Sequence, residues 1–143
     1  MLLTSDDLAA RGLGAWALGW ADSVRFGELD RQGHVNHAAY FTWFEGLRIR
    51  HFMHAGLSKY RPHDPRFVVA SITANYRAEM MLHDEYVVVT RCARMGRTSF
   101  VMDYGVFRRG AETANGAATV VLLRDGQPAP LTDAERASLS FRG

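Results

Sequence analysis

The stretch that decides the fold runs from Asp30 to Glu45 and reads D-R-Q-G-H-V-N-H-A-A-Y-F-T-W-F-E. It begins as a polar loop that turns at Gly33, and it then becomes a run dense in aromatic residues. Apolar residues spaced at 3.6 residues per turn predict a helix from about His37 to Ala55, and Gly56 is a natural stop. Because this helix is apolar on nearly every side, we expect it to be buried.

The remainder of the chain is predicted to be mostly strand. Ahead of the loop, apolar residues alternate from Ala15 to Phe26, with Trp16, Leu18 and Phe26 among those on one side. After the helix, four more strands are indicated, with turns at Met95–Arg97 and Arg109–Gly110. The predicted strands after the helix cover residues 68–77, 85–94, 98–108 and 113–124.

These elements predict an α+β fold in which one curved, antiparallel, five-stranded sheet wraps around one long buried helix. Short turns between the last four strands indicate that sequence neighbours pair in the sheet. The 143 residues fit a single domain. Residues 1–14 form an N-terminal extension that contains a short helix near Ser5. Residues 131–143 form a short C-terminal helix and tail, which a capping-box pattern opens at Thr132.

Composition limits the classes of function. Apolar residues make up 48% and charged residues 22% of the chain, and the formal net charge of +2 is too small to indicate nucleic-acid binding. Cys92 is the only cysteine, which fits a reducing compartment. The N-terminus carries Asp6 and Asp7 rather than a secretory signal. The apolar runs are too short to span a bilayer, so we expect a cytoplasmic protein without a membrane partner.

The order of elements and the sequence from Val24 to Glu45 resemble the hot-dog-fold acyl-CoA thioesterases of the 4-hydroxybenzoyl-CoA thioesterase type. The resemblance covers roughly Trp16 to Leu139 and is densest around the loop and helix. Two positions depart from the family pattern, His83 and Glu28, and neither touches the expected chemistry. The spacing of Asp30, Gly33, Val35 and Tyr40 carries the resemblance, with Asn75–Arg77, His83–Glu85 and Gly96–Ser99 as further landmarks.

The resemblance implies that Asp30 is the catalytic carboxylate and that the backbone N–H of His37 faces the thioester oxygen. It also implies a homodimer or homotetramer with acyl-CoA lying across a subunit interface. Chemistry agrees, because an aspartate can act as general base or nucleophile, and a helix N-terminus can stabilise an oxyanion. The alternative for Asp30 is a turn or capping aspartate. For the His37 side chain, the alternatives are direct catalysis and helix capping.

Other residues have candidate roles in binding the substrate. Gly33 shapes the loop, Asn36 positions water or fastens the loop, and the helix face that carries Tyr40 lines an acyl pocket. Arg94 and Arg97 are candidates for the coenzyme A phosphates, together with Arg91, Arg108 and Arg109, although each one taken alone is more simply a solvated turn residue.

No metal site and no cofactor are expected. His34 and His37 stand three apart, as do His51 and His54, but neither pair has a third ligand in the sequence. Glu45 on the helix is a second possible carboxylate, since some hot-dog thioesterases use one there, but pairing with Arg48 is the simpler interpretation.

The sequence thus favours an acyl-CoA thioesterase that uses Asp30 and the helix N-terminus at His37. Two alternatives remain: a non-catalytic acyl-CoA-binding or sensing module, and a hot-dog dehydratase acting on carrier-bound 3-hydroxyacyl groups. Fold alone does not separate them. The acyl group, and the choice between coenzyme A and acyl-carrier-protein thioesters, also stay open.

Overall fold

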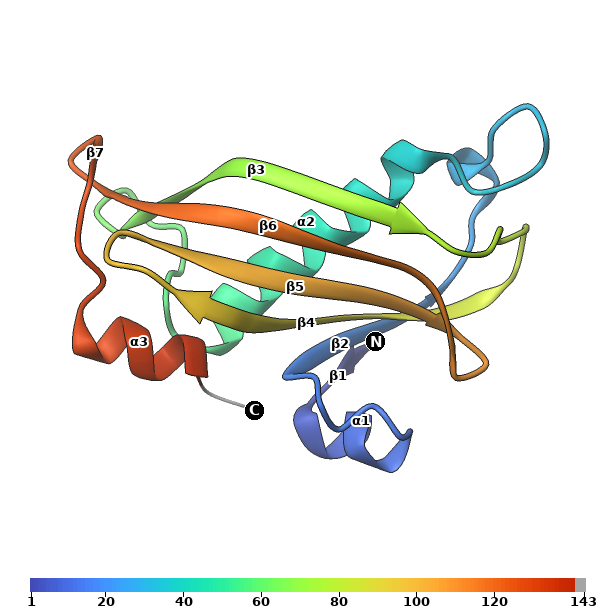
Figure 1. Cartoon of the computed structure of the whole chain (residues 1–143), viewed down its shortest axis with the longest axis horizontal. Helices are drawn as coiled ribbons and strands as arrows, with labels where there is room; N and C mark the ends of the chain where they lie inside the picture. The colour runs from blue at the N-terminus through green and yellow to red at the C-terminus, as the bar shows by residue number, and fades with distance from the viewer. Residues whose placement is uncertain (141–143) are drawn as a thin grey trace.

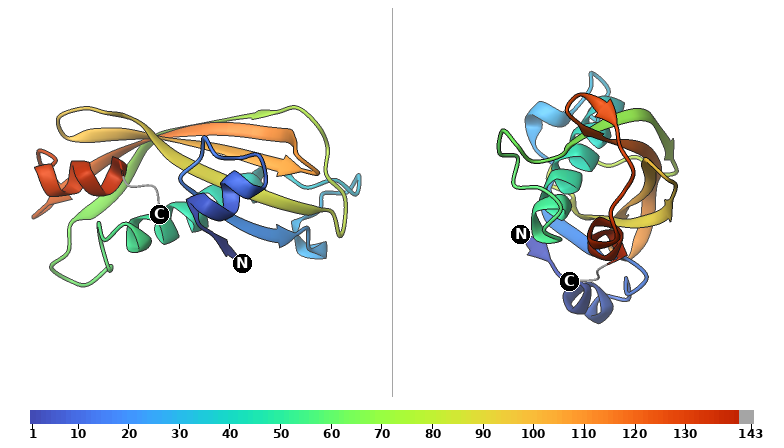
Figure 2. Two further views of the ribbon diagram at one scale, coloured as in Figure 1. Left: turned by 90° about the horizontal axis from the view of Figure 1, so that it is seen from below. Right: turned by 90° about the vertical axis from the view of Figure 1, so that its left-hand side faces the viewer.

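One long helix, α2 (His37–His54), lies in the hollow of an antiparallel sheet that curves around it (Figures 1 and 2). The structure is a computed structural model that describes residues 1–140, so the end of the predicted C-terminal tail, residues 141–143, lies outside the described residues. The strands are β1 (Leu2–Leu3), β2 (Leu18–Ser23), β3 (Arg66–Tyr76), β4 (Glu85–Met95), β5 (Ser99–Arg108), β6 (Ala111–Arg124) and β7 (Gln127–Pro128). The other helices are α1 (Ser5–Ala10), the 3₁₀ turn η1 (Phe26–Glu28) and α3 (Asp133–Ser140).

The fold is the predicted one, but the sheet of residues 1–140 has seven strands rather than five. The additional strands, β1 and β7, have two residues each, which is too short for an alternating pattern to be recognised. Strand β2 is also shorter than the predicted stretch from Ala15 to Phe26. Trp16 lies before β2 and packs against a small apolar cluster on the face of the sheet away from α2. Phe26 lies in η1 and is 81% exposed.

The order of the main strands is β1-β2-β4-β5-β6-β3, and it corrects the expected pairing of β3. The β4–β5–β6 hairpins pair as predicted. Strand β3, however, pairs with β6 and not with β4, the strand that follows it in the chain. The connection at residues 77–84 crosses from one side of the sheet to the other, past the N-terminal end of α2 (Figure 1). This crossing is what brings the end of β3 close to the start of the helix.

Close packing holds α2 against the sheet. Phe44 is fully buried and stacks on Tyr104, with ring centroids 4.7 Å apart. Gly116 in β6 makes this approach possible, because a Cβ atom there would lie 2.8 Å from the Phe44 ring. Arg48 is buried and donates a hydrogen bond to the Tyr104 hydroxyl at 2.9 Å. The predicted pairing of Arg48 with Glu45 is therefore wrong, because Arg48 lies one turn after Phe44 on the face that meets the sheet.

The opposite face of the sheet carries a smaller apolar cluster beneath α1, which comprises Leu3, Leu8, Leu13, Val87 and Val89. The first half of β4, from Tyr86 to Thr90, is consequently buried on both faces. None of the helices within residues 1–140 is long and apolar enough to cross a membrane.

Candidate active site

The N-terminus of α2 lies where the sequence predicts it. Asn36 is the N-cap residue, and its Oδ1 accepts a hydrogen bond from the backbone N–H of Ala39 at 2.8 Å. Asn36 therefore fastens the start of the helix, which is one of its two predicted roles. The alternative that the His37 side chain caps the helix is wrong, because His37 is the first residue inside the helix and Asn36 is the cap. The backbone N–H groups of His37 and Ala38 lie in the first turn of the helix and therefore have no intrahelical acceptor. They lie at the positive end of the helix dipole, which suits an anion or a developing oxyanion.

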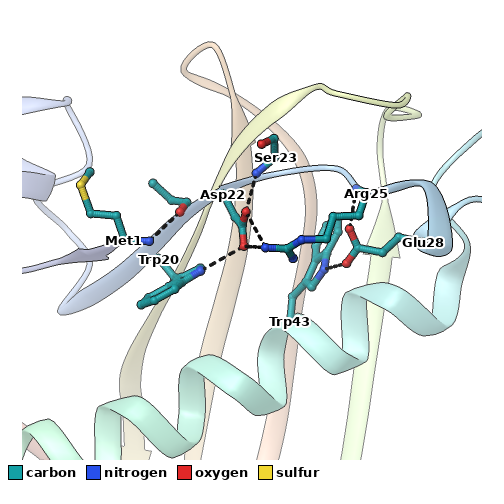
Figure 3. Close-up of polar contacts among 8 residues, drawn as sticks. Met1, Trp20, Asp22, Ser23, Arg25, Glu28 and Trp43 are labelled. Carbon is teal, nitrogen blue, oxygen red and sulfur yellow. Dashed lines mark hydrogen bonds and ion pairs between the residues drawn. The ribbon is translucent and has the colours of Figure 1, made fainter.

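Glu28 anchors this end of the helix to the chain that leaves β2 (Figure 3). Its Oε2 accepts a hydrogen bond from Trp43 Nε1 at 2.5 Å, and its Oε1 accepts one from the Arg25 backbone N–H at 2.9 Å. The Glu28 carbonyl also accepts from the backbone N–H of Asn36, at 2.8 Å. One residue thus fixes the helix cap and the second turn of α2 relative to η1.

A second carboxylate continues this network on β2. Asp22 accepts two hydrogen bonds from Arg25 Nη2, at 3.0 and 2.9 Å, and one from Trp20 Nε1 at 3.3 Å (Figure 3). Burial raises the pKa of Asp22, but the hydrogen bonds from Ser23, Trp20 and Arg25 outweigh this and hold the pKa below its usual value. Asp22 therefore stays ionised and keeps Arg25 in place.

The loop between η1 and α2 is organised around Asp30. Asp30 Oδ1 accepts hydrogen bonds from the backbone N–H groups of Gln32 at 2.8 Å and His34 at 3.1 Å. The Asp30 N–H donates to the His34 carbonyl at 2.7 Å, and Gly33 supplies the left-handed conformation that the turn needs, at φ +81°. Asp30 is thus a turn aspartate, yet both of these bonds use Oδ1 and neither uses Oδ2.

The loop is also tied to the crossover segment at residues 77–84. His34 Nε2 lies 3.1 Å from Glu79 Oε2, and the Val35 N–H donates to the Met80 carbonyl at 2.9 Å. These contacts hold the loop as one wall of a cleft and the end of β3 with the crossover as the other.

The cleft has a volume of about 680 Å³ and brings together the residues that the sequence singled out for chemistry. Asp30, His37 and Tyr40 all line it. Tyr40 is only 2% exposed, and burial raises the pKa of its hydroxyl to about 12, so the hydroxyl is protonated at neutral pH. The complete lining is Asp30, Arg31, Gln32, His34, Val35, His37, Tyr40, Tyr76, Arg77, Ala78 and Glu79.

The remaining predicted binding residues do not line this cleft. Gly33 shapes the turn of the loop, and Asn36 caps the helix. Arg94 and Arg97 lie at the β4–β5 hairpin, at the end of the sheet away from the start of α2 (Figure 1). Neither arginine lines this cleft, and their predicted contacts with phosphate stay predictions.

The sequence reasoning did not single out Tyr76 and Glu79 as residues of the site. Their contribution depends on the crossover of β3 to the far edge of the sheet, which no local pattern reveals. The only signal was that Tyr76 belongs to one of the landmark segments of the resemblance. Within residues 1–140, no three His, Cys, Asp or Glu side chains are grouped as a metal site would need.

Comparisons with known proteins agree with this fold. Residues 32–115, more than half of the chain, match the Thioesterase superfamily. A thioesterase-superfamily structure from Jannaschia sp. CCS1 is 39% identical, covers 97% of this chain and 91% of its own, and superposes with a TM-score of 0.89. A Thermus thermophilus thioesterase, solved with coenzyme A and Zn, is 35% identical over 87% of this chain and 92% of its own, with a TM-score of 0.78. The uncharacterized protein YsmA of Bacillus subtilis is 29% identical over 82% of this chain and 81% of its own. The chain belongs to the thioesterase superfamily and has its hot-dog fold.

Proposed function

We propose that the protein hydrolyses acyl-CoA thioesters to a free acid and coenzyme A, as enzymes of the 4-hydroxybenzoyl-CoA thioesterase type do. The observation that carries the proposal is that one cleft contains both the Asp30 carboxylate and the open N-terminus of α2. The first is a candidate base or nucleophile, and the second is a candidate oxyanion site. The coenzyme A bound in the Thermus thermophilus relative supports the class of substrate.

In the proposed reaction, the thioester carbonyl lies between the two groups with its oxygen toward the backbone N–H groups of His37 and Ala38. Asp30 removes a proton from a water molecule, and the hydroxide oxygen bonds to the carbonyl carbon. The resulting tetrahedral oxyanion is held by the N–H groups. It collapses by breaking the C–S bond, and the thiolate leaves and takes up a proton. If Asp30 is instead the nucleophile, its Oδ2 bonds to the carbonyl carbon and the C–S bond breaks to release the thiolate, which takes up a proton. Water then hydrolyses the resulting anhydride to the free acid and restores the Asp30 carboxylate.

We also propose that the enzyme is a cytoplasmic homo-oligomer, and β3 supports a direct contact between copies. Strand β3 ends the strand order, so within residues 1–140 one of its edges is unpaired. None of its residues is buried, and the ten residues from Phe67 to Tyr76 are uncharged. An exposed, uncharged strand edge is a template for pairing with another chain. The single cysteine, Cys92, is in keeping with a reducing compartment.

The decisive variant is Asp30→Asn, since an asparagine Oδ1 can still accept the hydrogen bonds from Gln32 and His34. The loop should therefore persist while the charge is lost. We expect thiol release from a panel of short, long and aromatic acyl-CoAs to fall by roughly a hundredfold or more, in the range typical of losing a general base. Circular dichroism and size-exclusion chromatography should not change. The matched control is Asp125→Asn in the exposed β6–β7 turn, which should keep full activity.

Near-normal turnover in Asp30→Asn would remove Asp30 from the mechanism. The same assay separates the alternatives. Tight binding of acyl-CoA by the wild type without release of thiol would identify a binding module. Loss of water from a 3-hydroxyacyl thioester, with the thioester bond intact, would identify a dehydratase.

A further inference from the structure

Tyr76 is the one aromatic residue of β3 that reaches the start of α2. Its ring stacks on the His37 imidazole, with the centroids 4.1 Å apart and the planes 11° from parallel. Its hydroxyl donates a hydrogen bond to the His37 carbonyl at 3.3 Å. The same ring makes an edge-to-face contact with Tyr40, with the centroids 5.1 Å apart. Tyr76 therefore holds both the side chain and the backbone of one residue at the helix N-terminus.

The His37 side chain has little other support. His37 is exposed, and among the described residues Tyr76 supplies the ring that stacks on its imidazole. An exposed imidazole at the start of a helix would otherwise sample several rotamers. Stacking on a ring that is itself held in the sheet by the pairing of Tyr76 with Ala114 restricts the imidazole to one orientation at the cleft.

The hydroxyl contributes separately. Burial raises the pKa of Tyr76, so the hydroxyl stays protonated and remains a donor at neutral pH. Its hydrogen bond to the His37 carbonyl joins the end of β3 to the first turn of α2. The wall of the cleft that comes from the sheet is thus tied to the wall that carries the helix donors.

We infer that Tyr76 is a positioning residue, which orients the His37 imidazole toward a thioester bound in the cleft. This inference rests on the proposed function and assigns the His37 side chain a part in it beyond that of the backbone N–H. A misplaced reacting group costs far more in turnover than in binding. Tyr76 should accordingly affect kcat more than KM.

The test is a double-mutant cycle with His37→Gln, Tyr76→Leu and the double variant. Tyr76→Leu should lower kcat by roughly tenfold with KM changed by less than about threefold. In the His37→Gln background, the same substitution should change kcat by less than about twofold. Tyr76→Phe, which keeps the ring, should restore most of the activity. Because Tyr76 is 37% exposed, these substitutions leave no cavity in the core, and thermal melting serves as the check of folding.

Equal losses from Tyr76→Leu in both backgrounds would show that Tyr76 acts independently of His37 and would overturn the inference. So would an unchanged kcat in Tyr76→Leu. A second measurement does not depend on activity. In NMR spectra of histidine-labelled protein, the His37 ring protons, assigned with His37→Gln, should be displaced by the neighbouring ring in the wild type and in Tyr76→Phe, but not in Tyr76→Leu. If the wild type releases no thiol, the proposed function fails, while these spectra still decide whether Tyr76 orients His37.

Discussion

His51 allows a quantitative prediction about stability and pH. It lies on α2, is 2% exposed, and neither ring nitrogen has a hydrogen-bond partner among the described residues. Burial, with a smaller contribution from His54, lowers the pKa of His51 from 6.5 to about 4. As the pH falls through 6.5, the histidine of the unfolded chain takes up a proton, whereas the folded one stays neutral until about pH 4. The unfolded state then binds more protons, and the folded state loses stability.

The size of the loss follows from the same two pKa values. Protonation of His51 in the unfolded chain lowers the free energy of unfolding by roughly 3 kcal/mol in total, once the pH is well below 4. Roughly 2 kcal/mol of this decrease occurs between about pH 7.5 and about pH 5. His51→Leu removes the titrating group and keeps a side chain of similar bulk. It should be neutral or mildly stabilising at pH 7.5, since a buried polar group without partners is replaced by an apolar one.

Urea unfolding of both proteins at the two pH values measures the effect. Between the higher and the lower pH, the free energy of unfolding should fall by about 2 kcal/mol more for the wild type than for His51→Leu. His63→Gln in the exposed α2–β3 connection controls for removing a histidine from the surface, and it should behave like the wild type. An identical loss in the wild type and in His51→Leu would refute the assignment of the pH dependence to His51. Carboxylates with lowered pKa values, such as Asp64, titrate at lower pH and do not distinguish the two proteins.

Two further substitutions test the packing that positions the cleft. Gly116→Ala would place a Cβ atom 2.5 Å from the Thr73 carbonyl oxygen and 2.8 Å from the Phe44 ring, so we expect a loss of roughly 3 kcal/mol in urea unfolding. Gly27→Ala, with no atom within 4 Å of the new Cβ, should cost little, and equal effects would contradict the packing argument. Glu28→Gln leaves one oxygen for the two donors that Glu28 now satisfies, and it should cost about 1–2 kcal/mol. Glu45→Gln on the exposed face of α2 is its control, and a comparable loss there would rule out the anchoring role of Glu28.

The parts of the fold that were predictable from the sequence are those that local chemistry determines. The bounds of α2 follow from the change from polar loop to apolar run at His37 and from the end of that run near Gly56, although the cap is Asn36 and not His37. The turn at Arg109–Gly110 follows from its residues, both of which have positive φ. The capping box of α3 was also predicted correctly. The Thr132 backbone N–H donates to Glu135 Oε1 at 2.9 Å, and the Glu135 backbone N–H donates to Thr132 Oγ1 at 3.1 Å.

Long-range pairing was not predictable in the same way. The segment at residues 77–84 is short enough to suggest a hairpin between β3 and β4. Strand β3 instead pairs with β6, where ten residue pairs align from Arg66↔Leu123 to Tyr76↔Ala114. Arg48 shows a related limit, because its position in the sequence suits a surface ion pair, and only the distant Tyr104 reveals that it turns inward. The candidate site was thus predicted for the loop and helix that form one wall and missed for the wall that β3 supplies.

The two interpretations of Asp30, as a turn residue and as a catalytic carboxylate, are compatible in this structure. The hydrogen bonds from Gln32 and His34 that make Asp30 a turn residue also fix the direction of its carboxylate. Catalysis by positioning needs that order before the substrate arrives. A carboxylate held at Oδ1 by the loop and available at Oδ2 is better placed to act on a thioester than one that rotates freely. The stability of the loop is therefore a requirement of the proposed chemistry and not a competing explanation for Asp30.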